Sequence, residues 1–258
     1  MKYRIISSVM AAALVLSCSV KEDRAGCACL LVLDMSPCSH APDNIRIDLE
    51  TSGERIEGDF IPGRDEPFYE YPVTKGICSL SAYLYPRELT VVAGAITVKP
   101  GDNCPEIYAS RSVFEVTGET AEHQVVLHKQ FALVTLDLEG SAWDRSDCSI
   151  KVKGSVAGLS LSDLRPVEGR FFYELPSGER SFRLPRQTSE SAGMLTMELY
   201  IPGGIPQVLE LGKYFSDVRY DWGREDLEDI VIKIDDSEIV IETGCSDWVI
   251  HSDEIIVI

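Results

Sequence analysis

Short stretches in which apolar and polar residues alternate make up most of the chain after residue 28. In the segment IRIDLE at 45–50, Ile45, Ile47 and Leu49 alternate with charged residues, which is the period of a half-buried strand. Similar patterns predict strands over 29–35, 55–60, 67–71, 77–85, 89–98, 112–116 and 121–128. Gly, Pro, Asp and Asn fill the gaps between them, as turns require. Regularly spaced short strands without amphipathic helices between them predict an all-β protein built of antiparallel sandwiches.

The strand pattern restarts in the middle of the chain. The segment FALVTLDL at 131–138 resembles CLLVLDM at 29–35, and the run from 194 to 211 repeats the order of strand, Pro and strand found from 77 to 98. This weak repeat predicts two tandem β-sandwich domains, 28–129 and 130–258, each of an ordinary domain size. Helix is expected only as a turn or two, at 161–164 and 221–227.

The C-terminal part of the chain combines strong β-formers with acidic residues. Segments 229–235 and 238–242 predict two strands whose buried faces carry Ile230, Ile232, Ile234, Ile239 and Ile241. Between 225 and 258 there are 11 acidic residues and one Lys, and such charges keep exposed strand edges from pairing with other chains. The sequence ends in the β-formers Ile255, Ile256, Val257 and Ile258. These four residues form either a last strand docked in the sandwich or a strand donated to a partner sheet.

The first residues read as a secretory signal. Lys2 and Arg4 precede an uncharged stretch of 12 residues, 5–16, and a membrane-spanning helix needs roughly 20 residues. The stretch ends in Val15-Leu16-Ser17-Cys18, which matches the lipobox of bacterial lipoproteins except that Leu16 is larger than usual. We therefore predict a lipoprotein signal peptide, 1–17, and a mature chain that begins with diacylated Cys18. The alternative is a plain signal peptide that happens to contain a cysteine.

A polar tether, 18–27, follows the predicted lipidation site. Lys21, Glu22 and Asp23 resemble the signal that exports lipoproteins of Bacteroidota to the outside of the outer membrane, although a solvated linker without an address would look the same. Each acyl CH₂ buried in a bilayer contributes about 0.8 kcal/mol, so several chains on Cys18 would anchor the protein stably. We expect an outer-membrane lipoprotein that is exposed at the cell surface.

The charge of the chain limits its partners. The net charge of the full sequence is −18, and removal of Lys2 and Arg4 with the signal peptide makes it −20. Such an acidic surface repels nucleic acid and anionic lipid, so we expect no nucleic-acid partner. Attachment to a membrane must then come from the lipid.

The cysteines allow disulfides, but their spacing does not determine which residues pair. The chain has eight cysteines, and seven remain if Cys18 carries lipid, so at least one thiol is left over. Cys148 and Cys245 are the only pair in the second half and are the candidate bridge there. Cys27, Cys29 and Cys38 have the wrong spacing for a zinc site, and no metal or other cofactor is predicted.

Signals for catalysis are weak throughout the sequence. There is no G-x-S-x-G segment, and His40, His123, His128 and His251 lie in no metalloprotease or triad motif. Trp143, Trp222 and Trp248 could stack on a sugar, but aromatic residues of this kind more often belong to a core or a domain interface. We predict a protein that is not an enzyme and has no small-molecule substrate.

The order of these features resembles a known family. The start VKEDRAGCAC at 20–29 running into LLVLD, the lipobox before it, and the later YDW, DLEDI and DW segments at 220–248 resemble the FimB-like fimbrial anchor lipoproteins of Bacteroidota. The resemblance covers nearly the whole mature chain, although no single motif is highly specific.

The resemblance implies two transthyretin-like sandwich domains and the role of anchor subunit of a type V pilus. Such a subunit is lipidated at the position of Cys18, lies at the base of the fimbrium, binds a stalk subunit and limits the length of the pilus. Subunits of these pili join by donor-strand exchange, in which a strand from one subunit completes the sheet of the next. The alternative is a glycan- or ligand-binding surface lipoprotein with the same topology. An open apolar groove or a loosely held edge strand would favour the anchor, and clustered exposed Trp and Tyr would favour the alternative.

Overall fold

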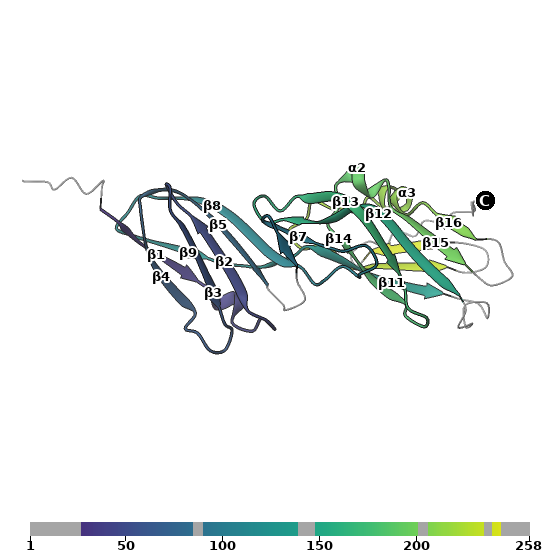
Figure 1. Ribbon diagram of the computed structural model, residues 1–258, viewed down its shortest axis with the longest axis horizontal. Helices are drawn as coiled ribbons and strands as arrows, with labels where there is room; N and C mark the ends of the chain where they lie inside the picture. The colour runs from purple at the N-terminus through teal and green to yellow at the C-terminus, as the bar shows by residue number, and fades with distance from the viewer. Residues whose placement is uncertain (1–26, 85–89, 139–147, 201–205, 235–238, 244–258) are drawn as a thin grey trace, which may run out of the picture.

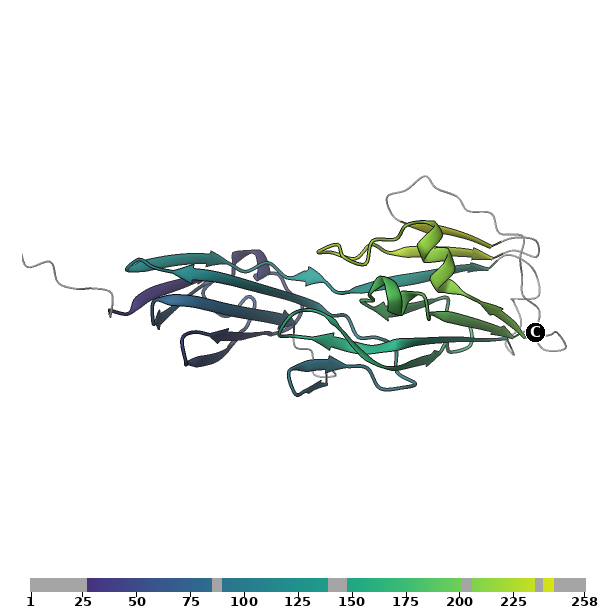
Figure 2. The ribbon, with the colours of Figure 1, turned by 90° about the horizontal axis from the view of Figure 1, so that it is seen from above.

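Two β-sandwiches lie end to end in the computed structural model of the protein (Figures 1 and 2). The structure describes residues 27–84, 90–138, 148–200, 206–234 and 239–243. The predicted all-β fold of two tandem sandwiches is confirmed. The domain limits at 27/28 and 129/130 stay a prediction. Residues 91–97 fall in the predicted first domain, but they pair with the large sheet of the second sandwich.

The first sandwich packs a sheet of three strands against one of five. The small sheet has the order β4-β1-β9, and the large sheet has the order β10-β8-β5-β2-β3. Their bounds are β1 Cys29–Asp34, β2 Ile45–Glu50, β3 Arg55–Phe60, β4 Phe68–Val73, β5 Gly76–Leu84, β8 Tyr108–Val116, β9 Thr120–Gln124 and β10 His128–Lys129. A short 3-10 helix, η3 Ser36–Cys38, follows β1. Alternate residues of β1 and β2 are buried between the sheets, as their period of two predicts.

The second sandwich repeats this plan. Its small sheet has the order β14-β11-β17-β18, and its large sheet has the order β16-β15-β12-β7-β6 with β13 also paired to β12. The bounds are β6 Val91–Val92, β7 Ala95–Thr97, β11 Phe131–Leu138, β12 Ser149–Ser160, β13 Pro166–Glu174, β14 Ser181–Pro185, β15 Thr196–Tyr200, β16 Gln207–Leu209, β17 Ile230–Ile234 and β18 Ile239–Thr243. Two helices, α2 Ser189–Ala192 and α3 Leu211–Asp217, complete it.

Pairing confirms the predicted match of 131–138 to 29–35, whereas the predicted match of 207–211 to 89–98 is wrong because β16 takes the place of β8. β1 pairs antiparallel with β4 and parallel with β9, and β11 pairs antiparallel with β14 and parallel with β17 in the same way. β12, β13, β15 and β16 correspond likewise to β2, β3, β5 and β8. The sheets are mainly antiparallel, as predicted, and each sandwich has one parallel pair because β9 and β17 cross over to lie beside β1 and β11.

The segment expected to be one strand at 89–98 is a hairpin that crosses to the second sandwich. β6 and β7 pair with each other through a turn at Ala93 and Gly94, whose φ values of 49° and 76° suit a tight hairpin turn. β7 also pairs with the end of β12. A Cβ atom on Gly158 would overlap the carbonyl oxygen of Ile96, so only glycine allows this close approach.

Both predicted helical turns are wrong. β12 continues to Ser160 and turns directly into β13, and Leu164 in that turn has a positive φ of 54°. Residues 221–227 form turns. The helix α3 lies earlier and buries Leu211, Tyr214 and Phe215 from one face against the sandwich.

Two cores fill the sandwiches. Ile230, Ile232 and Ile234 are buried as predicted, at 0–3% exposure, in the second core. That core also takes in Tyr83 and Ile107 from the first sandwich, so apolar packing is continuous across the joint between the units.

Candidate functional site

Most of the site residues predicted from the sequence lie outside the described residues. These are Cys18, Lys21, Glu22, Asp23, Cys245, Ile255, Ile256, Val257 and Ile258. Cys148 is described, and it packs half-buried against the second core just before β12. The bridge between Cys148 and Cys245 therefore stays a prediction.

Five other cysteines carry no disulfide: Cys27, Cys29, Cys38, Cys78 and Cys104. Burial raises the pKa of the Cys38, Cys78 and Cys104 thiols, which keeps them in the unreactive protonated form. Together with Cys29, which is also buried, these thiols serve as small apolar core residues.

One side of the first sandwich is open between β8 and β9. β8 pairs with β5 along nearly its whole length, but on its other side only Tyr108 and Ala109 have a strand partner, β10. Within the described part of the chain, residues 110–116 of β8 have no second strand partner, and β9 pairs only with β1. Two unpaired strand edges thus face the same side of the sandwich, and main-chain groups on such edges can pair with an added strand.

A cleft of about 400 Å³ follows this open side to the joint with the second sandwich. Leu80, Val125 and Val126 supply its apolar lining, and Val126 is 40% exposed. Its polar lining comes from both units: Ser110, Arg111, Ser112, His123, Gln124, His128, Gln130, Arg186, Arg224 and Glu225. We call this hollow the edge cleft.

His123 of β9 closes the middle of the edge cleft. Its Nε2 lies 2.7 Å from the Ser112 hydroxyl of β8, and its ring stacks on Phe114 with 4.1 Å between the ring centroids. Burial lowers the pKa of His123, so the neutral ring is favoured. The two sheets are joined here by side-chain contacts and not by main-chain pairing.

Arg186 fixes the joint end of the edge cleft. The side chain is 8% exposed, and its Nε donates to the amide oxygen of Gln130 at 2.7 Å. Nη1 donates to the Trp222 carbonyl at 2.5 Å, and Nη2 donates to the carbonyls of Arg224 and Glu225 at 2.6 and 3.0 Å. These four acceptors carry no net charge, and burial lowers the pKa of the guanidinium. A buried positive charge therefore lies beside the cleft.

The linker between the units is held by the loop before β17. The Asp226 carboxylate binds His128 Nδ1 at 2.9 Å and accepts from the Lys129 N–H at 2.7 Å. Burial alone would raise the pKa of Asp226, but these hydrogen bonds outweigh burial and lower it. Lys129 Nζ also binds Asp229, and the Leu227 N–H donates to the Lys129 carbonyl at 3.1 Å. The linker is thus part of the packed structure.

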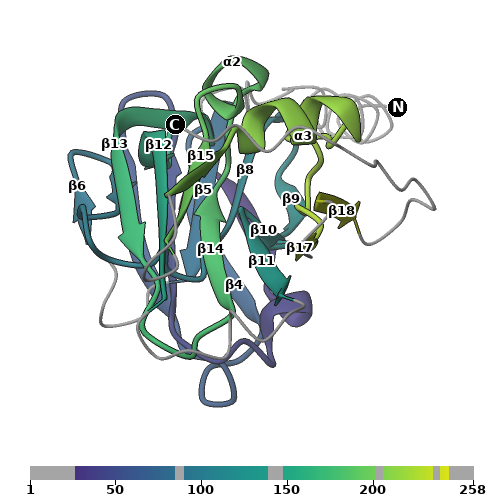
Figure 3. The ribbon, with the colours of Figure 1, turned by 90° about the vertical axis from the view of Figure 1, so that its right-hand side faces the viewer.

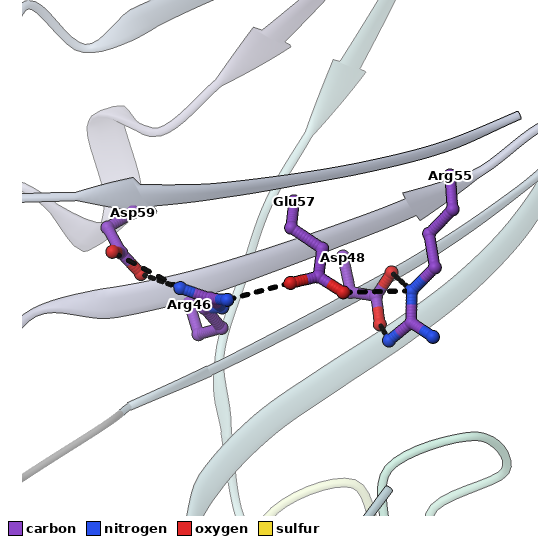
Figure 4. Close-up of polar contacts among 5 residues, drawn as sticks. All are labelled: Arg46, Asp48, Arg55, Glu57 and Asp59. Carbon is purple, nitrogen blue, oxygen red and sulfur yellow. Dashed lines mark hydrogen bonds and ion pairs between the residues drawn. The ribbon is translucent and has the colours of Figure 1, made fainter.

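Charged side chains cover the opposite edge of the first sandwich, at β3. On the outer face of β2 and β3, Arg46 binds Glu57 at 2.8 Å and Asp59 at 3.0 Å, and Arg55 binds Asp48 and Glu57 (Figure 4). β3 is the edge strand of the large sheet. Side-chain exposures of 28–62% keep each pair weak, so this ladder protects the edge more than it stabilises the fold.

Other candidate chemistry finds little support. Trp222 is buried and packs edge-on against Phe215 and Tyr220, as the core interpretation predicts, whereas Trp143 and Trp248 lie outside the described residues. In the part of the chain that the structure describes, no three His, Cys, Asp or Glu side chains gather as metal ligands. No helix among the described residues is long and apolar enough to cross a membrane.

Comparison with solved structures finds proteins that share the fold of this chain. A candidate adhesin of Bacteroides thetaiotaomicron matches with a TM-score of 0.60 at 11% identity, over 88% of this chain and 97% of that one. The fimbrial anchor protein Mfa2 of Porphyromonas gingivalis matches with a TM-score of 0.58 at 13% identity, over 88% and 100% of the two chains. This chain shares their fold. A candidate polysaccharide-binding protein of B. thetaiotaomicron gives a TM-score of 0.60 at 10% identity, over 88% and 99%. No family model and no curated protein sequence matches the chain.

Proposed function

We propose that the protein is the anchoring subunit of a fimbria of the type V class. In this proposal lipid on Cys18 holds the chain in the outer membrane, residues 18–27 form the tether, and the first sandwich receives a strand from a stalk subunit. The role is structural and non-catalytic, and it attaches the pilus to the cell and limits its length.

The open edge of β8 beside the edge cleft carries this proposal. A strand added there would gain a row of main-chain hydrogen bonds, and alternate side chains could enter the cleft against Leu80 and Val125. The shared fold with the fimbrial anchor protein Mfa2 supports the assignment. The lipobox before Cys18 supplies the membrane attachment that an anchor needs.

The first test compares pili on cells and in culture fluid for the wild-type strain and for Cys18→Ala. We expect the variant to shed its pili or to make longer pili that leave the cell. Unchanged amount, length and attachment would exclude the anchor role, and binding of glycans would then be tested for the alternative function.

A second pair of variants tests the edge cleft. Ser112→Tyr fills the cleft from β8, and Val113→Tyr changes the next residue, whose side chain is 58% exposed outside the cleft. We expect Ser112→Tyr to lose stalk subunits from the purified protein while Val113→Tyr retains them, with equal far-ultraviolet circular dichroism. Equal stalk binding by both variants would remove the cleft from the proposed function.

A further inference from the structure

A hollow separate from the edge cleft lies on the second sandwich, where α2 and α3 pack side by side (Figures 1 and 3). Its volume is about 480 Å³, within the range of roughly 300–1,000 Å³ that is typical of small-molecule sites. Gly212 allows the two helices to approach this closely, because a Cβ atom there would overlap the Ala192 carbonyl oxygen. The apolar part of the lining comes from Ala192 and from the rings of Phe215, Tyr220 and Trp222. We call this hollow the helix pocket.

The C-terminal end of α3 forms a Schellman motif that shapes the wall of the helix pocket. The Tyr220 N–H donates to the Phe215 carbonyl at 2.9 Å. The Arg219 N–H donates to the Ser216 carbonyl at 3.1 Å. The ring of Tyr220 then lies 5.9 Å from that of Phe215 and 4.6 Å from that of Trp222, measured between centroids. Three aromatic rings are therefore gathered beside α2 by the way in which α3 ends.

Arg219 stands at the position of this motif where glycine is usual. Its φ of 54° lies in the left-handed region, in which a side chain costs stability relative to glycine. The side chain is exposed and lines the helix pocket. Among the described residues, no carboxylate forms an ion pair with Arg219. Backbone preference thus opposes an arginine here, and residues kept against such a preference concentrate at functional sites.

Polar groups complete the rim of the helix pocket. Ser189, Ser216 and Asp221 join Arg219 in its lining. The Asp221 carboxylate uses Oδ1 to accept from the Gly223 N–H at 2.8 Å, so Oδ2 remains to accept from a ligand. The guanidinium is a donor only, the carboxylate is an acceptor only, and the two hydroxyls can do both. The rim can therefore bind a ligand that presents donors and acceptors side by side.

This combination of groups restricts the chemistry of the ligand. A purely apolar molecule would cover Arg219 and Asp221 without giving them hydrogen-bond partners, which costs free energy. A phosphate or other multiply charged anion would be repelled by Asp221 and by a chain of net charge −18. A sugar ring satisfies both parts of the lining, because its hydroxyl groups donate and accept while its C–H face is apolar. Trp222 is only 6% exposed, so the rings offer edges that suit a single sugar residue.

We propose that the helix pocket binds one pyranose residue of a glycan. The C–H face of the sugar lies against Tyr220 and Trp222, and neighbouring hydroxyls bind the Arg219 guanidinium and the Asp221 carboxylate. The helix pocket and the edge cleft have no residue in common among their described lining residues. Glycan binding is therefore an additional function of the second sandwich, and it does not depend on the anchoring role.

Saturation-transfer NMR on the mature chain from residue 19 tests this proposal directly. The probes are the methyl glycosides of glucose, galactose, mannose and N-acetylglucosamine, with inorganic phosphate as a competitor. We expect saturation to reach the ring protons of at least one glycoside, and Arg219→Gly to weaken its affinity roughly tenfold through the lost charged hydrogen bonds. Absence of transfer to all of these glycosides overturns the proposal. Displacement of a bound glycoside by an equal concentration of phosphate would show an anion site and overturns it too.

Ala93→Gly is the matched control for the backbone. Ala93 also has a left-handed φ, 49°, but it lies in the turn between β6 and β7, outside the helix pocket. We expect both glycine variants to raise the urea midpoint of unfolding, since glycine accepts a positive φ without strain. Only Arg219→Gly should lose affinity for the glycoside. Equal affinity in the two variants overturns the role of Arg219 in binding.

Arg219→Lys separates binding from a purely structural role. A positive charge near the end of α3 stabilises the helix, and lysine keeps that charge while losing the planar pair of N–H donors. We expect this variant to keep the wild-type urea midpoint and to lose most of the affinity for the glycoside. A lower urea midpoint with unchanged affinity would make Arg219 a residue that only stabilises the helix end, and it overturns the assignment.

Discussion

The two sandwiches share one strand topology but differ beside β9 in the first unit and β17 in the second. In the second unit, β18 pairs along β17, so the small sheet gains a further strand. The helix α3 covers the same unit between β16 and β17, burying Tyr214 and Phe215. In the first unit the equivalent strand, β9, has β1 as its partner, and the described residues between β8 and β9 contain no helix. Among the described residues, the small sheet is thus extended by one strand in the second unit and ends at β9 in the first.

Contacts across the joint couple the two units. The second core includes residues of the first sandwich, and Ser81 of β5 donates to the carbonyl of Leu161 at 2.9 Å. We therefore expect the two units to respond together when the joint is changed. The predictions below run from the largest expected loss of stability to the smallest.

The largest effect is expected from Arg186→Met. The variant removes four hydrogen bonds and leaves the carbonyls of Trp222, Arg224 and Glu225 without this donor, which costs about 3–5 kcal/mol of unfolding free energy. Urea unfolding measures the change. Arg170→Met is the control, because Arg170 is exposed and lies over the Phe172 ring. Equal losses in the two variants would contradict the structural role of Arg186.

A smaller loss is expected from Gly158→Ala. The added methyl group overlaps the Ile96 carbonyl oxygen, so β7 must move away from β12 at a cost of about 1–3 kcal/mol. Hydrogen exchange should then increase at 95–97 while β1 and β2 stay protected. An unchanged exchange rate at 95–97 would show that the hairpin is not held by this close contact.

The smallest effect is a dependence on pH that His123 adds to the open side. Because burial lowers the folded-state pKa of His123 below 6.5, the unfolded chain binds the proton more readily. The contribution of His123 to stability is therefore complete above pH 6.5 and decreases as the pH falls from there toward the folded-state pKa. His123→Gln should flatten the unfolding free energy between pH 7 and 5, and the wild-type slope in the variant would contradict this.

Local sequence patterns predict the strands well and the contacts between distant strands poorly. β2 and β3 fall at their expected residues because alternation along each strand reports which face is buried. The repeat of β1 in β11 can be read for the same reason. The segment 89–98 looks like a single strand because its run of β-formers does not reveal the turn at Gly94 or the partner β12.

The edge cleft could not be predicted from the sequence, since its residues come from six separate segments. Arg186 and Gln130 have no motif in common, and Ser112 and His123 meet only after β8 and β9 fold into different sheets. The helix α3 did leave a signal, because Leu211, Tyr214 and Phe215 are spaced as i, i+3 and i+4. The site residues that the sequence predicts near the two ends of the chain stay predictions.

The crossing hairpin β6–β7 has a mechanical consequence. The backbone passes the joint three times: from β5 to β6, from β7 back to β8, and from β10 to β11. Tension applied between the two ends of the molecule is therefore carried by the β10–β11 connection and also by the hairpin, whose load passes to the second unit through the β7–β12 hydrogen bonds in shear. Two sandwiches joined by a single linker would bend relative to each other, whereas the additional contacts of the hairpin across this joint resist bending.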